Sequence, residues 1–187
     1  MIKIYDANKL SLDEILARET TATGVEDIVS GIIKDVRENG DAALYKYCEK
    51  FDKVTLSSLE VTPEEIEEAL GLVEPEFLEI LKEAAANITE YHKNQVRDGF
   101  EIKKADGIIL GQKVIPVRRA GLYVPGGTAA YPSTVLMDSI PAKIAGVKEL
   151  CITTPPAKDG KVNPVILAAA SIAGVDRIFK VGGAQAI

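Results

Sequence analysis

Apolar residues recur at helical spacing through the first hundred residues of the chain. Between residues 25 and 36 they fall three or four positions apart, which predicts an amphipathic helix that ends at Gly40. The predicted apolar face consists of Val25, Ile28, Val29, Ile32, Ile33 and Val36. Asp41 then begins a second helix, and Pro75 begins a longer one that extends to about Gln95. The pattern therefore predicts a helical first half.

Polar residues mark where some of these helices begin. Residues 11–14 and 62–65 each read as a capping box, in which a Ser or Thr and a Glu three positions later satisfy each other's backbone amides. Paired glutamates at 64–65 and 67–68 could be interpreted as general acid–base residues. They lie on polar helical faces with no apolar pocket indicated, so we expect solvated carboxylates and a structural role.

The hydrophobic period changes after these helices. Apolar and polar residues from 100 to 110 flank Asp106 and Gly107, which predicts a β-hairpin with a type I′ turn. Residues 112–117 continue in extended character and include Pro116, which is typical of an edge strand or a crossing segment.

Three short apolar runs then alternate with two helical segments. We expect strands at residues 122–124, 149–153 and 177–181, and helices at residues 133–145 and 163–173. Crossovers of this length connect parallel strands, so the segment is half of a doubly wound nucleotide-binding fold. The sequence stops at residues 182–187, where a third helix should begin, and would leave an open sheet edge. We therefore expect a fragment of a longer protein, or a partner that completes the fold.

The most informative stretch is the first strand–helix passage, residues 119–133. Its glycine pair would let backbone N–H groups approach an anionic ligand at the start of a helix. The pattern is not G-x-G-x-x-G, and the second strand ends in Thr153 rather than in an acid for a ribose hydroxyl. An atypical nucleotide site and a simple tight turn both remain open, here and at Gly182 and Gly183.

Charge and composition narrow the possible partners. The net charge of −6 and the absence of a Lys/Arg cluster argue against nucleic acid. No apolar window reaches the length of a membrane span, and the first residues lack the apolar core of a signal peptide. Cys48 and Cys151 are expected to be buried thiols of a cytoplasmic protein. His92 is the single histidine, so we interpret it as a surface or helix-end residue and expect no zinc site built within this chain.

Three segments carry a family resemblance. They are residues 121–137 (GLYVPGGTAAYPSTVLM), residues 140–146 (IPAKIAG) and residues 181–187 (VGGAQAI). Together they closely resemble histidinol dehydrogenase, and the helical leader with residues 87–95 (NITEYHKNQ) resembles the N-terminal region of that family. The resemblance spans essentially the whole chain, and two glycine motifs at this spacing are more specific than a lone glycine-rich loop.

The resemblance implies a fold and an activity. The family oxidises L-histidinol to L-histidine through L-histidinaldehyde and reduces two NAD in succession. It is a zinc-dependent, intertwined homodimer with two incomplete Rossmann-like domains. For this chain it implies an α/β fold with a helical N-terminal region and hairpin (1–118, part of the first domain). A partial Rossmann-like, aldehyde-dehydrogenase-like parallel sheet (119–187), incomplete at the C-terminus, follows.

The resemblance also implies which residues contact the cofactor. Tyr123 and Gln185 match the tyrosine and the glutamine that contact NAD in the family. The family's zinc ligands, its Glu-His catalytic pair and most of its substrate contacts fall beyond Ile187, and His92 matches none of them. We therefore expect no catalytic and no metal-binding residues in this chain, and no dehydrogenase turnover from it alone.

Two other functions are compatible with the pattern. One is another aldehyde-dehydrogenase-like NAD(P) enzyme, such as glutamyl-phosphate reductase, which needs a cysteine nucleophile in a later domain. Cys151 lies inside a buried-looking strand and does not support that chemistry. The other is a non-catalytic assembly module that retained the fold. NAD binding and the sequence that follows Gln185 would separate these possibilities.

Overall fold

The computed structural model describes residues 10–11, 24–126 and 130–187. The helices are α2 (Val25–Asn39), α3 (Asp41–Tyr47), α4 (Pro63–Leu72), α5 (Pro75–Lys93), α6 (Pro132–Ile144) and α7 (Pro164–Ile172), with a π-helical turn η1 (Cys48–Asp52) and a 3-10 turn η2 (Ala184–Ala186). The strands are β1 (Phe100–Lys103), β2 (Ile109–Gln112), β3 (Arg119–Tyr123), β4 (Glu149–Thr153) and β5 (Arg177–Phe179). Apart from Ser11, the predicted capping box at 11–14 lies outside the described residues.

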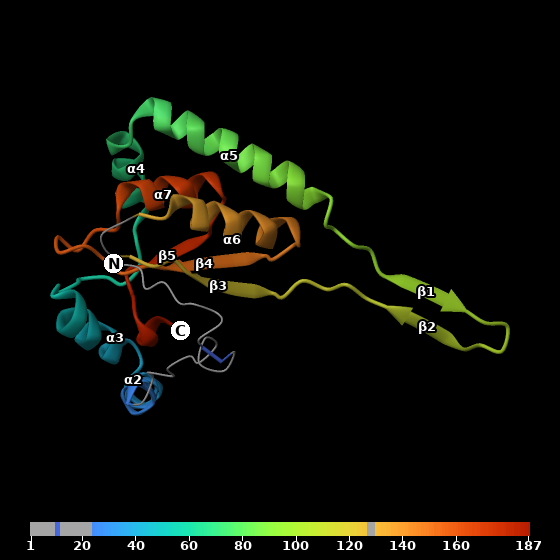
Figure 1. Cartoon of the computed structure of the whole chain (residues 1–187), viewed down its shortest axis with the longest axis horizontal. Helices are drawn as coiled ribbons and strands as arrows, with labels where there is room; N and C mark the ends of the chain where they lie inside the picture. Colours follow the sequence, from blue (N-terminus) through green and yellow to red (C-terminus); the bar gives the residue numbers. More distant parts are fainter. Residues whose placement is uncertain (1–9, 12–23, 127–129) are drawn as a thin grey trace.

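The predicted parallel sheet is confirmed. Strands β3, β4 and β5 lie side by side in that order, both pairs are parallel, and α6 and α7 are the crossovers. Helices α6 and α7 cover one face of the sheet, and α5 and α4 lie over them as a further layer (Figure 1). The side chain of Asn163 caps α7 by accepting a hydrogen bond from the amide of Val165 at 2.9 Å. This local cap explains why α7 begins at the predicted position.

The main core joins the helical first half to the sheet. Buried residues of α4 and α5 pack with those of α6, α7 and the central strands in a single cluster. Leu150 and Ile152 in β4 and Val124 after β3 are fully buried, which fits a central strand covered by helices. Helix α2 has a different environment, because only Ile32 of its predicted apolar face is buried whereas Val25 and Ile28 are more than half exposed.

Helix α4 begins with the predicted capping box. Thr62 Oγ1 accepts a hydrogen bond from the amide of Glu65 at 3.3 Å, and the Glu65 carboxylate accepts one from the amide of Thr62 at 2.8 Å. The expectation that Glu65 is a solvated surface carboxylate is wrong. Its oxygens also accept hydrogen bonds from Lys180 Nζ at 2.9 and 3.2 Å, and the Lys180 side chain is only 8% exposed. Glu65 and Lys180 are 115 positions apart, so this pair could not be predicted from the sequence.

The hairpin of β1 and β2 projects away from the rest of the molecule (Figure 1). Its strands pair as expected, but the prediction of a type I′ turn is wrong. Lys104 and Ile108 are hydrogen-bonded across a three-residue loop, and Gly107, whose φ is 83°, donates to the Lys104 carbonyl. A type I′ turn requires positive φ at both central residues, and Asp106 does not adopt it. Asp106 and Gly107 are therefore the last two residues of a three-residue loop.

The two faces of the hairpin differ in character. On the apolar face, the register places Ile102 opposite Leu110. On the other face, Lys103 lies opposite Ile109 and forms an ion pair with Glu101 at 3.0 Å. Ile102 and Leu110 are about half exposed in this chain. The hairpin therefore contributes little to the packed core.

Substitution of Ile102 by Thr should change the free energy of unfolding by less than about 0.5 kcal/mol, because little contact is lost. The same substitution at Ile178, which is 3% exposed in β5, should cost about 2 kcal/mol or more. Urea unfolding of both variants measures the difference. Equal losses at the two positions would contradict the weak attachment of the hairpin.

The outer edge of β5 is covered, in contrast to the open edge that we expected. The connection between η1 and α4 runs antiparallel to β5, with a bridge between Glu60 and Phe179. The amide of Val61 donates to the Ile178 carbonyl at 2.9 Å, and the amide of Lys180 donates to the Leu59 carbonyl at 2.7 Å. The apolar and polar residues of this segment alternate from Leu59 to Thr62, but Ser57 and Ser58 interrupt the pattern before them. The alternating run is therefore too short to be recognised as a strand partner from sequence.

Candidate functional site

Three connecting segments meet where the parallel strands end. They follow β3 at Val124, β4 at Thr154 and β5 at Lys180. The ladder extends one residue past the strands, because Val124 N donates to the Thr153 carbonyl at 2.9 Å and Thr154 N donates to the Phe179 carbonyl at 3.0 Å. In open parallel sheets this carboxyl edge is where ligands bind, since backbone groups and loop side chains converge there. The candidate site is therefore at this edge.

Pro155 lies between two of the glycines that stood out in the sequence. A Cβ atom added to Gly182 would meet Pro155 Cβ at 2.6 Å, and one added to Gly126 would clash with Pro155 Cγ. Gly126 has no positive φ, so close approach and not turn geometry requires a glycine there. Gly127 lies outside the described residues. The two glycines thus hold the segments after β3, β4 and β5 against one another.

The two predicted cofactor-contacting residues come to the same edge. The Tyr123 hydroxyl, at the end of β3, accepts a hydrogen bond from the Gly183 amide at 3.2 Å. Gly183 has a φ of 66° and begins the turn η2, in which Gln185 lies. The Tyr123 side chain is 36% exposed, whereas Gln185 is 7% exposed. The Gly183 amide therefore connects Tyr123 to the turn that carries Gln185, which lies 62 positions later in the sequence.

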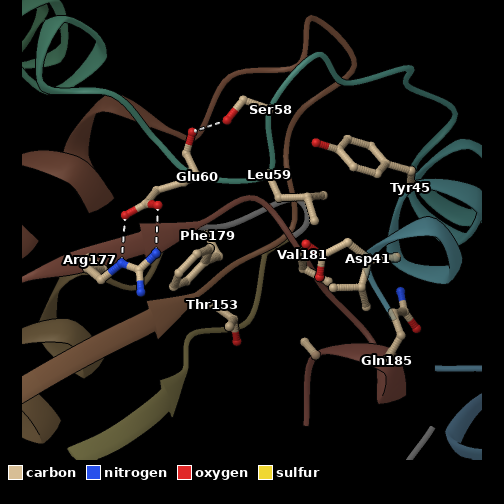
Figure 2. A pocket seen from close by; sticks show the side chains of 12 residues that line it. Asp41, Tyr45, Ser58, Leu59, Glu60, Thr153, Arg177, Phe179, Val181 and Gln185 are labelled. Atoms are coloured by element: carbon tan, nitrogen blue, oxygen red, sulfur yellow. Dashed lines mark hydrogen bonds and ion pairs between the residues drawn. The ribbon is translucent and has the colours of Figure 1, made fainter. Parts of the chain in front are cut away.

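Gln185 lines a cavity of about 350 Å³ on the sheet face opposite α6 and α7. Figure 2 shows its amide beside Asp41 of α3 at one end of the cavity, with the Glu60–Arg177 pair at the other. Within the described part of the chain, Gln185 Oε1 is buried and has no hydrogen-bond partner. A buried amide oxygen without a partner is costly, so the packing of the described residues alone does not account for the position of Gln185.

Charges along the wall of this cavity are largely neutralised. The Glu60 carboxylate accepts two hydrogen bonds from the Arg177 guanidinium, both at 2.8 Å (Figure 2). The hydrogen bonds from Arg177 lower the pKa of Glu60 below its ordinary value. Arg177 also lies 3.9 Å from Glu149, which pairs with Arg119 at 2.6 Å. This row of ion pairs crosses the sheet at the first residues of the three strands, so the guanidinium of Arg177 that lines the cavity is already paired.

A second cavity, of about 480 Å³, is lined by Pro155. It is lined by the segments after β3 and β4, by the start of α7 and by Asp52 of η1. Asp52 Oδ2 is buried and has no hydrogen-bond partner among the described residues. Burial raises the pKa of Asp52, and a hydrogen bond with Cys48 opposes this shift. Nothing in the local sequence distinguishes Asp52 from other helix-end aspartates, so its burial could not be predicted.

The remaining candidate residues do not form a metal or nucleophilic centre in the described residues. Both cysteines are free, and burial raises the pKa of the Cys48 thiol to about 11 and also raises the pKa of Cys151. His92 Nδ1 lies 2.6 Å from Gln95 Oε1 at the end of α5, as expected for a helix-end histidine. No group of three or more His, Cys, Asp or Glu side chains within the described ranges could hold a metal ion. Within the same ranges, every helix is too short or too polar to cross a bilayer.

Comparison with known proteins identifies relatives of this fold and sequence. The family model for histidinol dehydrogenase matches residues 16–187. Histidinol dehydrogenase of Clostridium acetobutylicum is 57% identical over 159 residues, which cover 85% of this chain and 37% of that protein. The Methanosarcina barkeri enzyme is 46% identical over 186 residues, which cover 99% of this chain and 43% of that protein.

A solved structure extends the likeness to three dimensions. The crystal structure of histidinol dehydrogenase from Elizabethkingia anophelis superposes with a TM-score of 0.86 at 36% identity. It is matched over 95% of this chain and 42% of that chain, and this chain likewise spans about two fifths of the length of its curated relatives. The expected α/β fold with a partial Rossmann-like sheet is confirmed, and so is the resemblance. The chain belongs to the histidinol dehydrogenase family.

Proposed function

We propose that the whole protein oxidises L-histidinol to L-histidine through L-histidinaldehyde and reduces two NAD in the process. Membership of the histidinol dehydrogenase family supports this activity over that of glutamyl-phosphate reductase or of an assembly module. The half-buried Cys151, whose pKa is raised by burial, is also poorly suited to act as a nucleophile. Because the chain spans about two fifths of its relatives, we assign the reaction to a longer protein.

The NAD site is proposed at the carboxyl edge of the sheet, with Tyr123 and Gln185 as contacts. The hydrogen bond between the Tyr123 hydroxyl and the Gly183 amide is the observation that carries this assignment. It fixes a partly exposed phenol beside a buried, unpartnered amide oxygen at the edge where dinucleotides bind in this class of sheet. These residues fit a cofactor with both hydrogen-bond donors and apolar rings. NAD supplies the hydride acceptor, and this chain binds and orients it.

Other features of the reaction are proposed to lie outside this chain. The described residues do not fit a zinc site, so we derive no catalytic step through zinc. We propose that zinc ligands and the acid–base pair come from further sequence, that the whole protein is a cytoplasmic homodimer, and that residues 1–118 form part of a first domain. Residues 119–187 would then begin the NAD-binding domain. The chain by itself should show no histidinol-dependent NADH formation.

Calorimetric titration of this chain with NAD tests the proposed site. Tyr123→Phe removes the hydroxyl that Gly183 contacts, and should weaken NAD binding by about tenfold because the turn carrying Gln185 loses its anchor. Tyr45→Phe is the matched control, because Tyr45 lies on α3 and lines the cavity without that bond. Wild-type chain that binds no NAD would refute the site. Normal turnover by this chain alone with histidinol, zinc and NAD would refute the proposal that the catalytic residues lie in further sequence.

A further inference from the structure

The turn that carries Gln185 depends on other elements for its position. η2 is a single 3-10 turn, within which the amide of Ala186 donates to the Gly183 carbonyl at 3.1 Å. One such turn is marginal by itself, because short 3-10 runs have poor hydrogen-bond geometry and nucleation is unfavourable. The Tyr123 hydroxyl anchors this turn from the sheet through the Gly183 amide. The helices that precede the sheet provide a second set of contacts.

The alanines on either side of Gln185 pack into two separate small clusters. Ala184 packs against a buried cluster from α2 and α3, which consists of Ile32, Ala43 and Tyr47. Ala186 packs against a second buried cluster, which joins η1 to the end of β5 and consists of Cys48, Leu59 and Val181. These contacts fix the backbone of the turn, and within the described residues they leave the amide oxygen of Gln185 without a partner.

Helices α2 and α3 form a unit that packs mainly on this turn. Among the described elements, α2 makes its main contacts with α3 and with η2, and α3 also contacts η2. Neither helix contributes a described residue to the main core. Both helices lie on the sheet face opposite α6 and α7 (Figure 1). The unit is therefore placed to act on the turn more than on the core.

Tyr47 of α3 is held in place by α2. Its ring stacks on that of Phe51, with the ring centroids 5.5 Å apart. Its hydroxyl hydrogen-bonds the Asp35 carboxylate of α2, which also accepts from Asn39 Nδ2 and Lys46 Nζ, both at 2.7 Å. The hydrogen bonds from Lys46, Tyr47 and Asn39 lower the pKa of Asp35 to about 2, so the charged form that accepts them prevails at neutral pH.

Resting on the proposed NAD site, we propose that Tyr47 is a positioning residue for the cofactor. Its side chain is part of the buried cluster on which Ala184 lies, and it thereby keeps the turn that carries Gln185 in the arrangement that binds NAD. Such preorganisation raises affinity, because the turn is already ordered before the cofactor binds. The family resemblance did not indicate Tyr47.

Calorimetric titration with NAD tests this role. Tyr47→Ala should weaken NAD binding by about tenfold, since the turn must then be ordered on binding. Tyr47→Phe, which keeps the ring in the cluster, should retain most of the affinity. Leu81→Ala is the matched control, because it opens a cavity in the main core at a residue of α5 that is 5% exposed. It should lower the unfolding temperature and leave the NAD affinity unchanged.

A double-mutant cycle separates positioning from general destabilisation. Gln185→Ala removes the proposed contact itself. If Tyr47 acts through Gln185, adding Tyr47→Ala to Gln185→Ala should cause a further loss of less than about twofold. A general loss of structure would instead weaken binding equally in both backgrounds. Tyr47→Leu, which keeps a smaller apolar side chain, takes the place of Tyr47→Ala in the cycle if thermal unfolding shows that the latter does not fold.

The outcomes distinguish this role from the NAD site. Equal losses in the two backgrounds, or full affinity in a folded variant that lacks the Tyr47 ring, would overturn the role of Tyr47 and leave the NAD site standing. A loss of affinity in Leu81→Ala as large as that in Tyr47→Ala would also overturn it. If wild type binds no NAD, or if Gln185→Ala binds it with full affinity, the proposed NAD site fails and the role of Tyr47 fails with it.

Discussion

Replacing Glu65 with Gln should lower the free energy of unfolding by about 3 kcal/mol, whereas replacing Lys180 with Met should cost only about 1 kcal/mol. The asymmetry follows from burial, because the Lys180 side chain is 8% exposed and that of Glu65 is 23% exposed. The Glu65→Gln variant would keep a buried ammonium without a counter-charge. The Lys180→Met variant would instead keep a carboxylate that reaches water and still accepts from the Thr62 amide. Urea unfolding of each variant measures both values.

A double-mutant cycle and a pH series sharpen this prediction. The double variant, which combines Glu65→Gln with Lys180→Met, should be more stable than Glu65→Gln alone, since the unpaired ammonium is gone. Burial raises the pKa of Glu65, but hydrogen bonds from Lys180 and the Thr62 amide outweigh it and lower that pKa below its ordinary value. The stabilisation is therefore present above the ordinary pKa of a glutamate and is lost as pH falls through the lowered one. Equal losses in the two single variants would contradict the buried-ammonium account.

Replacement of either glycine that flanks Pro155 by Ala should destabilise the chain by about 2 kcal/mol and weaken NAD binding. At both positions the new Cβ would overlap the proline ring, and overpacking of a rigid ring displaces the adjoining segments. Gly121→Ala is the control, because no atom outside its immediate chain neighbours lies within 4 Å of a Cβ added there. Thermal unfolding and NAD titration of the three variants give the comparison.

A second substitution, at Pro155, should rescue only one of the two variants. The Cβ of Gly126→Ala meets chiefly Pro155 Cγ and Cδ, which Pro155→Ala removes. The Cβ of Gly182→Ala meets Pro155 Cβ at 2.6 Å, an atom that alanine retains. Adding Pro155→Ala to Gly126→Ala should therefore recover stability, and adding it to Gly182→Ala should not. Rescue of both, or of neither, would show that contact with Pro155 is not what requires these glycines.

Local signals predicted the elements well because they act within a few residues. The caps at Thr62 and Asn163 form as their sequences indicate, and the parallel order of β3, β4 and β5 follows from the length of the crossovers. The turn at Asp106 and Gly107 was the exception. The dipeptide suits more than one loop length, and the cross-strand pairing of Lys104 with Ile108 selected the longer loop.

Burial was predicted less well, because a periodic pattern shows which face is apolar but not what covers it. The apolar residues of α2 follow the predicted spacing, yet Ile28 is 64% exposed in this chain. The segment that pairs with β5 alternates over only four residues, so the sequence indicated an open edge. In the structure the backbones of Leu59 and Val61 are hydrogen-bonded along that edge. Both differences arise from contacts between elements.

Sequence patterns were enough to predict the helices and strands, the parallel sheet and the family to which the glycine motifs belong, and the family resemblance indicated Tyr123 and Gln185. The folded structure was needed to show that the Tyr123 hydroxyl accepts a hydrogen bond from Gly183, that Pro155 lies between two glycines and that Glu65 neutralises Lys180. Caps, turns and periodicity depend on neighbours within about four residues. The Tyr123–Gly183 and Glu65–Lys180 contacts span 60 and 115 positions, and such contacts exist only once the chain has packed.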